Sequence, residues 1–143
     1  MSFWQNPGVI ALGSGLAAQA AKVVVELLVR RRWRPMLFLA NGGMPSSHAA
    51  TVTTLCLLVG FQSGFTSDLF SLALVFGLFV VFEATGLRLE MGKQAQLLNQ
   101  LLDGGLGRGG MAGRRLRELL GHTWGEVVGG VVFGAAFYYL AAH

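Results

Sequence analysis

Four long apolar blocks, separated by polar connections, constrain the fold of this chain more than any other feature. They are Gly8–Val29, Ala49–Phe61, Leu69–Phe82 and Val127–Ala142. A bilayer core about 30 Å thick takes about 20 helical residues, which the first block reaches alone and the others reach with their polar flanks. Charged residues make up only 13% of the chain, whereas about 25% is usual for a soluble domain. We therefore predict an all-α, polytopic membrane bundle with four main transmembrane helices.

Positive residues are distributed unevenly over the three connections between these blocks. The connection 62–68 has none, while the first and third connections carry Arg30, Arg31, Arg32 and Arg34, and Arg88, Lys93, Arg108, Arg114, Arg115 and Arg117. By the positive-inside rule, the first and third connections are cytoplasmic and both termini lie on the opposite side. The net charge of +4 comes without a nucleic-acid-binding motif, so we expect membrane lipids as partners and no nucleic acid.

The third connection contains a segment with helical periodicity, "MGKQAQLLNQLLD", residues 91–103. Its apolar and polar stripes predict a short amphipathic or connecting helix that lies on the membrane surface or roofs the bundle. The glycine-rich stretch at about 104–113 is interpreted as a flexible tether within a single domain, 1–143. Gly130 and Gly134 lie one helical turn apart and favour close helix packing, within one chain or in a homodimer.

The stretch "GGMPSSHAATVTT", Gly42 to Thr54, places polar residues where the second apolar helix begins. Ser46, Ser47 and His48 would lie in its first turn, where free N–H groups and the helix dipole attract anions. Two structural alternatives remain open, because a serine also caps helices and a lone histidine is more often structural than catalytic.

Other polar residues fall on the same predicted side of the membrane. Lys22 and Glu26 are four residues apart in the first helix, with Gln19 on the same face. Because an intramembrane charge costs about 2.5–3.5 kcal/mol, both should face the protein interior, either as a mutual ion pair or with Lys22 binding a ligand. Glu83, Arg88 and Lys93 follow the third helix.

His122 and Glu126 are one helical turn apart at the start of the fourth helix. The carboxylate can accept the proton of one imidazole nitrogen, which leaves the other nitrogen free to attack. The structural alternative is an interfacial histidine beside a solvated glutamate. Two histidines surrounded by cations nevertheless suggest phosphate chemistry, which needs a nucleophile, an acid for the leaving oxygen and a basic cradle.

Three ordered motifs, "GGMPSSHAA", "EATGLRLEMGKQAQLLN" and "LRELLGHTWGEVVGG", together resemble the divergent, short branch of the type-2 phosphatidic-acid phosphatases. This branch belongs to the superfamily that includes vanadium-dependent haloperoxidases. The resemblance extends from about Lys22 to Gly134. It implies a phosphatase without metal or cofactor, which hydrolyses phosphatidylglycerophosphate, phosphatidate or an isoprenoid phosphate or diphosphate through a phosphohistidine.

The resemblance also implies roles for individual residues. His122 would be the nucleophile, Glu126 its supporting acid and His48 the proton donor to the leaving group. The phosphate-binding residues would be Ser46, Ser47, Arg88, Lys93 and Lys22, with Glu83 and Glu26 in support. The sequence departs from the superfamily pattern at Ser47, where glycine is usual, and at Glu126, where aspartate is usual.

Two other functions are compatible with the same residues. A non-catalytic protein could bind anionic lipid headgroups in the same pocket. A transport component could instead use Lys22 and Glu26 to line a path through the membrane. Glu83 and Glu90 also leave room for a metal ion that the resemblance does not imply.

Overall fold

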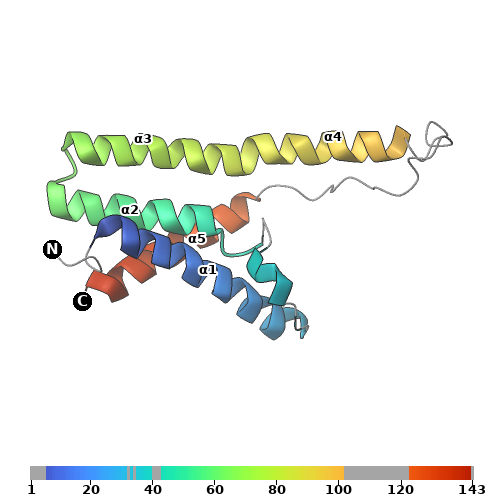
Figure 1. Ribbon diagram of the computed structural model, residues 1–143, viewed down its shortest axis with the longest axis horizontal. Helices are drawn as coiled ribbons and strands as arrows, with labels where there is room; N and C mark the ends of the chain where they lie inside the picture. Colours follow the sequence, from blue (N-terminus) through green and yellow to red (C-terminus); the bar gives the residue numbers. More distant parts are fainter. Residues whose placement is uncertain (1–5, 32, 34, 40–42, 102–122, 143) are drawn as a thin grey trace.

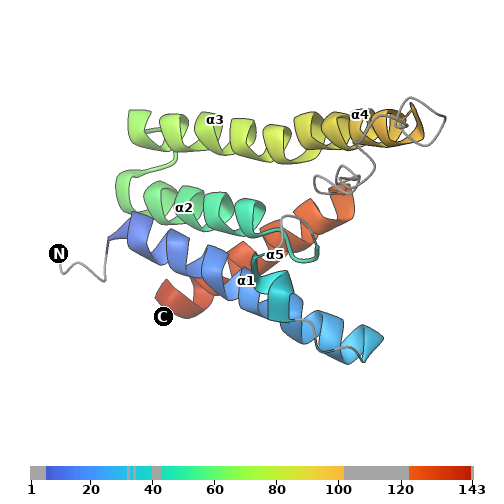
Figure 2. The same ribbon diagram turned by 45° about the vertical axis from the view of Figure 1, so that its right-hand side comes forward.

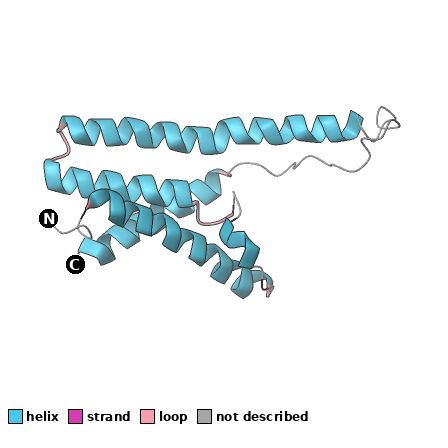
Figure 3. Cartoon of the chain, in the orientation of Figure 1, coloured by secondary structure: helices cyan, strands magenta, loops and turns pink. Residues whose placement is uncertain are grey.

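The computed structural model describes residues 6–31, 33, 35–39, 43–101 and 123–142. Every element in these ranges is helical (Figure 3), which confirms the all-α class for the described residues. The α-helices are α1 (Pro7–Arg30), α2 (Ser47–Ser63), α3 (Asp68–Phe82), α4 (Arg88–Leu101) and α5 (Trp124–Ala142), and the short helices are the 3-10 helix η2 (Pro35–Leu39) and the π-helical turn η3 (Glu83–Leu87).

Short polar side chains determine where the helices begin. The side chain of Asn6 accepts a hydrogen bond from the second residue of α1, and Pro7 occupies the first helical position, where its missing N–H group is not needed. The hydroxyl oxygens of Ser46 and Ser67 cap α2 and α3 in the same way. Each cap satisfies a backbone N–H group that the helix itself leaves without a partner.

The central helix of the bundle is α2, which contacts α1, α3 and α5. Figures 1 and 2 show it running between α1 and α3, with α5 crossing behind. The starts of α2 and α5 lie at one end of the bundle, where α3 ends (Figure 1). The start of α1 and the end of α5 lie at the opposite end. This path brings Lys22 of α1, the start of α2 and Glu126 of α5 to the same region.

Glycines let α5 approach α2 until the backbones touch. A Cβ atom on Gly134 would lie 2.5 Å from the carbonyl oxygen of Ala50, and one on Gly130 would collide with Ser46. The hydroxyl of Thr54 donates to the carbonyl oxygen of Gly134 at 3.0 Å, across the same interface. The Gly130–Gly134 pair therefore packs helices within one chain, as small residues commonly do in membrane proteins.

Large apolar side chains face outward on the long helices. Within α3 only Gly77 is buried, where it packs against Val52 of α2, while side chains such as Leu72 and Phe79 are exposed. Three helical stretches are long and apolar enough to cross a membrane, namely Pro7–Val29, Asp68–Leu101 and Trp124–Ala141. The described helices thus form a helical membrane protein. At 17 residues, α2 is shorter than these stretches, so three of the four predicted spans are matched by helices that meet the length and composition of a span.

The segment predicted as a short amphipathic or connecting helix forms α4, which is joined to α3 through η3. Figure 1 shows α3, η3 and α4 as one rod that extends beyond the other helices, and the main contacts of α4 are with η3. The hydroxyl of Thr85 donates to the carbonyl oxygens of Val81 and Phe82, at 2.9 and 3.2 Å. These hydrogen bonds supply a donor to two backbone carbonyl oxygens beside the π turn, where the regular helical hydrogen bonds are interrupted. The helix continues through the turn into α4. The expectation that α4 roofs the bundle is wrong.

Candidate functional site

The loop before α2 is held against the first turn of α5. The backbone N–H of Ser46 donates to the carbonyl oxygen of Glu126 at 3.0 Å, and the Ser46 hydroxyl oxygen accepts from the N–H of Ala49 at 3.3 Å. Gly43 has a φ angle of 93°, a backbone conformation that favours glycine. The Met44–Pro45 peptide bond that follows is cis. The first turn of α2 is therefore fixed in position by α5.

Lys22 of α1 extends beneath this loop. A Cβ atom on Gly43 would lie 3.7 Å from Cδ of Lys22, and only 4% of the Lys22 surface is exposed. Among the described residues, its ammonium nitrogen has no hydrogen-bond partner, and neither has the side-chain oxygen of Gln19, one turn earlier on α1. A buried ammonium group without a partner carries a desolvation penalty of several kcal/mol. An anion bound beside Nζ would offset that penalty.

Glu126 connects α5 with the start of α2. Its carbonyl oxygen accepts the N–H of Ser46 at 3.0 Å, and its carboxylate accepts the N–H of Thr123 at the start of α5. The alternative that Lys22 forms a hydrogen-bonded ion pair with Glu26 is wrong, because the Lys22 ammonium has no hydrogen-bond partner among the described residues. The structure therefore brings Lys22, Glu126 and the start of α2 together from three helices.

The carboxylate of Glu126 also has a structural partner that the sequence analysis missed. Its Oε2 atom accepts the backbone N–H of Thr123 at 3.2 Å, and the Thr123 hydroxyl accepts the N–H of Glu126 at 3.3 Å. This reciprocal pair is a capping box, and its signal was present in the sequence as Thr-x-x-Glu. Glu126 therefore holds the start of α5 in addition to any part in chemistry.

We expect Thr123→Ala to lower the free energy of unfolding by about 1 kcal/mol, because it removes half of this capping box. Thermal unfolding of the detergent-purified protein would measure the change. Thr123→Ser keeps the hydroxyl and should unfold like the wild type. An alanine variant as stable as the serine variant would contradict the capping role.

The serines and the histidine of the second helix lie near this cluster. Ser46 is fully buried and Ser47 nearly so, which favours the structural alternative for Ser46, the capping of α2. Ser47 is the first residue of α2, and its carbonyl oxygen accepts the hydroxyl of Thr51 at 2.9 Å. His48 is the second residue of α2 and is half-buried. Its position in the first turn is as predicted.

Two other predicted site residues, Lys93 and Glu83, are exposed on the rod formed by α3, η3 and α4. Lys93 lies on α4 with its side chain 61% exposed, and it pairs with Glu90 at 2.6 Å. Glu83 begins η3 and is exposed, while Glu26 is half-buried in α1. Arg88 is the first residue of α4, with its side chain outside the described part of the structure, and His122 lies outside the described residues. No group of three or more His, Cys, Asp or Glu side chains suited to a metal gathers among the residues described.

The arrangement of Lys22 and α2 is suited to binding an anion. The side chain of Lys22 passes Gly43 in the loop that leads into α2, and the first turn of a helix carries the positive end of its dipole. A tetrahedral oxyanion can accept hydrogen bonds from both sources at once. The half-buried imidazole of His48 is in the same turn, so proton transfer to a bound group is chemically available.

Comparison with known proteins identifies relatives of the chain. A model of the family described as the divergent PAP2 family matches residues 4–137. The membrane protein YuiD of Bacillus subtilis (strain 168), described as uncharacterized, is 34% identical over 139 residues, which cover 90% of this chain and 88% of the relative. No solved structure matches the chain significantly. Together with the three apolar helical stretches, the match to a membrane protein identifies the chain as an integral membrane protein.

Proposed function

Because the chain belongs to the divergent PAP2 family, we propose that it is a membrane phosphatase that hydrolyses the phosphate ester of a lipid through a phosphohistidine. The substrates proposed are phosphatidylglycerophosphate, phosphatidate or an isoprenoid phosphate or diphosphate. The observation that carries the proposal is the buried ammonium of Lys22 beside the start of α2, because this pairing of cation and helix terminus suits a phosphate group.

In the proposed reaction, neutral His122 attacks phosphorus and a P–N bond forms as the bond to the lipid oxygen breaks. His48 donates its proton to that departing oxygen, and Glu126 stabilises the imidazolium of His122. Water then gives a proton back to His48 and attacks the phosphohistidine, which releases inorganic phosphate. Lys22 and the N–H groups at the start of α2 stabilise the charge on the non-bridging oxygens, with Arg88 as a further predicted contributor.

In this proposal, the roles of Ser46 and Glu126 include the hydrogen bonds by which they cap α2 and α5. Ser46 holds the shape of the anion-binding turn through its hydrogen bonds to Ala49 and Glu126. Ser47 offers its backbone N–H group. Glu126 uses Oε2 for its own helix, so its electrostatic effect on His122 comes from the carboxylate charge as a whole.

We expect Lys93→Gln to leave phosphate release within about twofold of the wild type, because exposed ion pairs contribute little. Lys93 is 61% exposed and paired with Glu90. The rate measured with a saturating lipid phosphate is the test. A loss of a hundredfold or more would instead place Lys93 at the phosphate in the working enzyme.

The proposed topology has four membrane-spanning helices, with α2 as the fourth. Its 17 residues measure about 26 Å at 1.5 Å per residue, which suffices when polar flanks extend the helix toward both surfaces. The site would then face the cytoplasm, where the arginine-rich connections lie by the positive-inside rule, with both termini on the other side. The homodimer remains a prediction, to be tested by the mass of the protein in detergent.

A second candidate function is a protein that binds anionic lipid headgroups without hydrolysing them. The capping role of Glu126 favours it, because a helix cap requires no catalysis. The phosphatase predicts that the wild type releases phosphate, and the lipid-binding protein predicts that it does not. Both functions require Lys22 to bind the anionic headgroup.

The proposed function is tested by phosphate release from the three substrate classes by detergent-purified protein. Release that continues in the presence of a metal chelator and ends in the His122→Ala variant supports the phosphatase. No release from any lipid phosphate, together with retained binding of phosphatidate vesicles, supports the lipid-binding protein.

A further inference from the structure

Gln19 and Lys22 lie on the face of α1 that packs against the start of α2. A Cβ atom on Gly15, one turn before Gln19, would lie 3.6 Å from the carbonyl oxygen of Ser47, and a Cβ atom on Gly43 would lie 3.7 Å from Cδ of Lys22. Residues 15, 19 and 22 share one face of a helix. Gln19 is therefore positioned between two contacts of α1, one with the first turn of α2 and one with the loop before it.

Two buried polar atoms on this face have opposite hydrogen-bonding capacities. The side-chain oxygen Oε1 of Gln19 can only accept a hydrogen bond, whereas the ammonium nitrogen Nζ of Lys22 can only donate. Both atoms are buried, and neither has a hydrogen-bond partner among the residues that the structure describes. An unpaired buried acceptor costs free energy, as an unpaired donor does. A ligand that satisfies both atoms must carry a negatively charged oxygen together with an O–H or N–H group.

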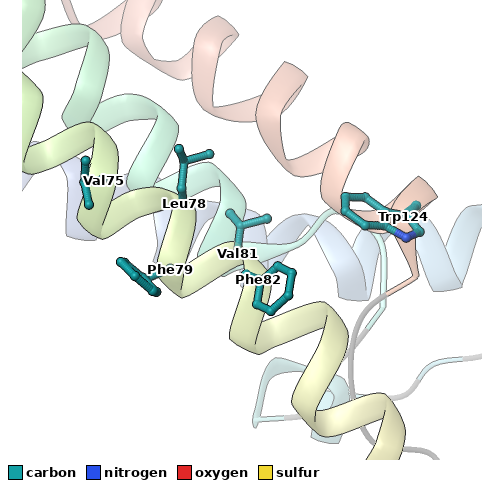
Figure 4. A pocket seen from close by; sticks show the side chains of 6 residues that line it. All are labelled: Val75, Leu78, Phe79, Val81, Phe82 and Trp124. Atoms are coloured by element: carbon teal, nitrogen blue, oxygen red, sulfur yellow. The ribbon is translucent and has the colours of Figure 1, made fainter.

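The apolar groove between α3 and the start of α5 provides no such acceptor (Figure 4). Its volume is about 510 Å³, and no side-chain oxygen lines it. The lining residues are Val75, Leu78, Phe79, Val81, Phe82 and Trp124. Between these two places, a polar headgroup therefore finds its hydrogen-bond partners where α1 meets α2 and not in the groove.

Phosphate esters differ in whether they carry a hydrogen-bond donor. A phosphate monoester takes up one proton with a pKa of about 6, and in this monoanionic form it has charged oxygens together with one P–OH group. A phosphodiester has a charged oxygen but no P–OH group. The monoanion of a monoester therefore satisfies Lys22 and Gln19 at once, whereas a diester leaves the oxygen of Gln19 without a donor.

We propose that Gln19 is a specificity-determining residue, whose side-chain oxygen accepts the P–OH hydrogen of a phosphate monoester while Lys22 binds a charged oxygen of the same group. The inference rests on the proposed function and narrows its substrate class to monoesters bound as the monoanion. It gives the site a means of rejecting phosphodiesters, the form in which phosphate occurs in most membrane phospholipids, because they leave a buried acceptor unsatisfied.

The test compares two anions of equal charge and similar shape that differ in this one donor. At pH 5, methyl phosphate is mainly a monoanion with one P–OH group, and methyl sulfate is a monoanion with none. Their affinities for the detergent-purified protein are measured by isothermal titration calorimetry. Gln19→Met removes the acceptor with little change in side-chain length. Gln96→Met is the matched control, because Gln96 is exposed on α4.

We expect the wild type to bind methyl phosphate at least about tenfold more tightly than methyl sulfate, because methyl sulfate brings no donor to the buried oxygen of Gln19. Gln19→Met should bring the two affinities within about threefold of each other, and Gln96→Met should keep the wild-type ratio. Lys22→Met should weaken the binding of both anions by a similar factor. A glutamine with only a structural role would affect thermal stability and leave the ratio of affinities as it is.

Equal affinities in the wild type would overturn the inference, and this comparison requires no variant to fold. A wild type that binds neither anion, or a Gln19→Met protein that keeps the wild-type ratio, would overturn it as well. The proposed function fails separately. Phosphate release from lipid phosphates without any difference between the two methyl esters removes this inference alone. An intact difference without release removes catalysis and leaves a protein that recognises phosphate monoesters.

Discussion

Replacing Lys22 with methionine should abolish most phosphate release while it makes the protein more stable. The ammonium is buried and has no hydrogen-bond partner in the described part of the structure, so its removal relieves a desolvation penalty, and we expect about 1–3 kcal/mol of added stability. The same change removes a cation from the phosphate, with an expected loss of about 10²–10³-fold in kcat/KM. Thermal unfolding and phosphate release would be measured on one preparation.

The opposite signs of the two effects distinguish a functional lysine from a structural one. A lysine that holds helices together would lose stability and activity together when replaced. Lys93→Met is the matched control, because it removes a cation whose side chain is 61% exposed, and it should change neither quantity much. A Lys22→Met protein that is both less stable and fully active would refute the anion site.

His122→Ala should reduce phosphate release by at least about 10³-fold, because the proposed nucleophile is lost and only binding and electrostatic stabilisation remain. Brief reaction with a ³²P-labelled lipid phosphate, followed by a denaturing quench, would detect an acid-labile phosphohistidine in the wild type alone. His48→Ala should also release phosphate slowly, since it lacks the proton donor. A labelled phosphohistidine that persists in His122→Ala would assign the nucleophile to another histidine.

Glu126→Gln separates the chemistry at His122 from the capping of α5. Glutamine at this position can still accept the N–H of Thr123, as in other capping boxes, so stability should change little. Loss of the charge should lower the rate in the proposed mechanism, because the imidazolium is no longer stabilised. A variant with the wild-type rate would leave Glu126 with its structural role only.

The apolar blocks predicted the helices of this fold well, because runs of apolar residues in a lipid solvent have few alternatives to helix. The helix predicted over residues 91–103 is present as α4, Arg88–Leu101, but its placement over the bundle was wrong for a physical reason. Arg88, Glu90 and Lys93 mark a change of surroundings from hydrocarbon to water, but a helix can pass through such a change without bending. The π turn that carries α3 into α4 has no signal in the sequence pattern.

The candidate site was predictable in part. The meeting of Lys22 with the start of α2 followed from the side of the membrane on which the polar residues fall. The unpaired state of Lys22 did not follow, because helical spacing places Glu26 one turn away, whereas the Lys22 ammonium has no hydrogen-bond partner in the described part of the structure. The groove beside Trp124 was not predictable either, since Leu78 and Phe82 resemble any other lipid-facing residues of α3.

The contact between α2 and α5 has a consequence for how far relatives of this chain can diverge. Ordinary soluble cores tolerate exchanges among large apolar residues, but here backbone lies against backbone at Gly130 and Gly134. Substitution should therefore be almost unrestricted on the surface of α3 and severely restricted at these two positions. The Bacillus subtilis relative, at 34% identity, should have drifted on its exterior and kept glycine at both positions, because even the Cβ atom of alanine would collide with the α2 backbone.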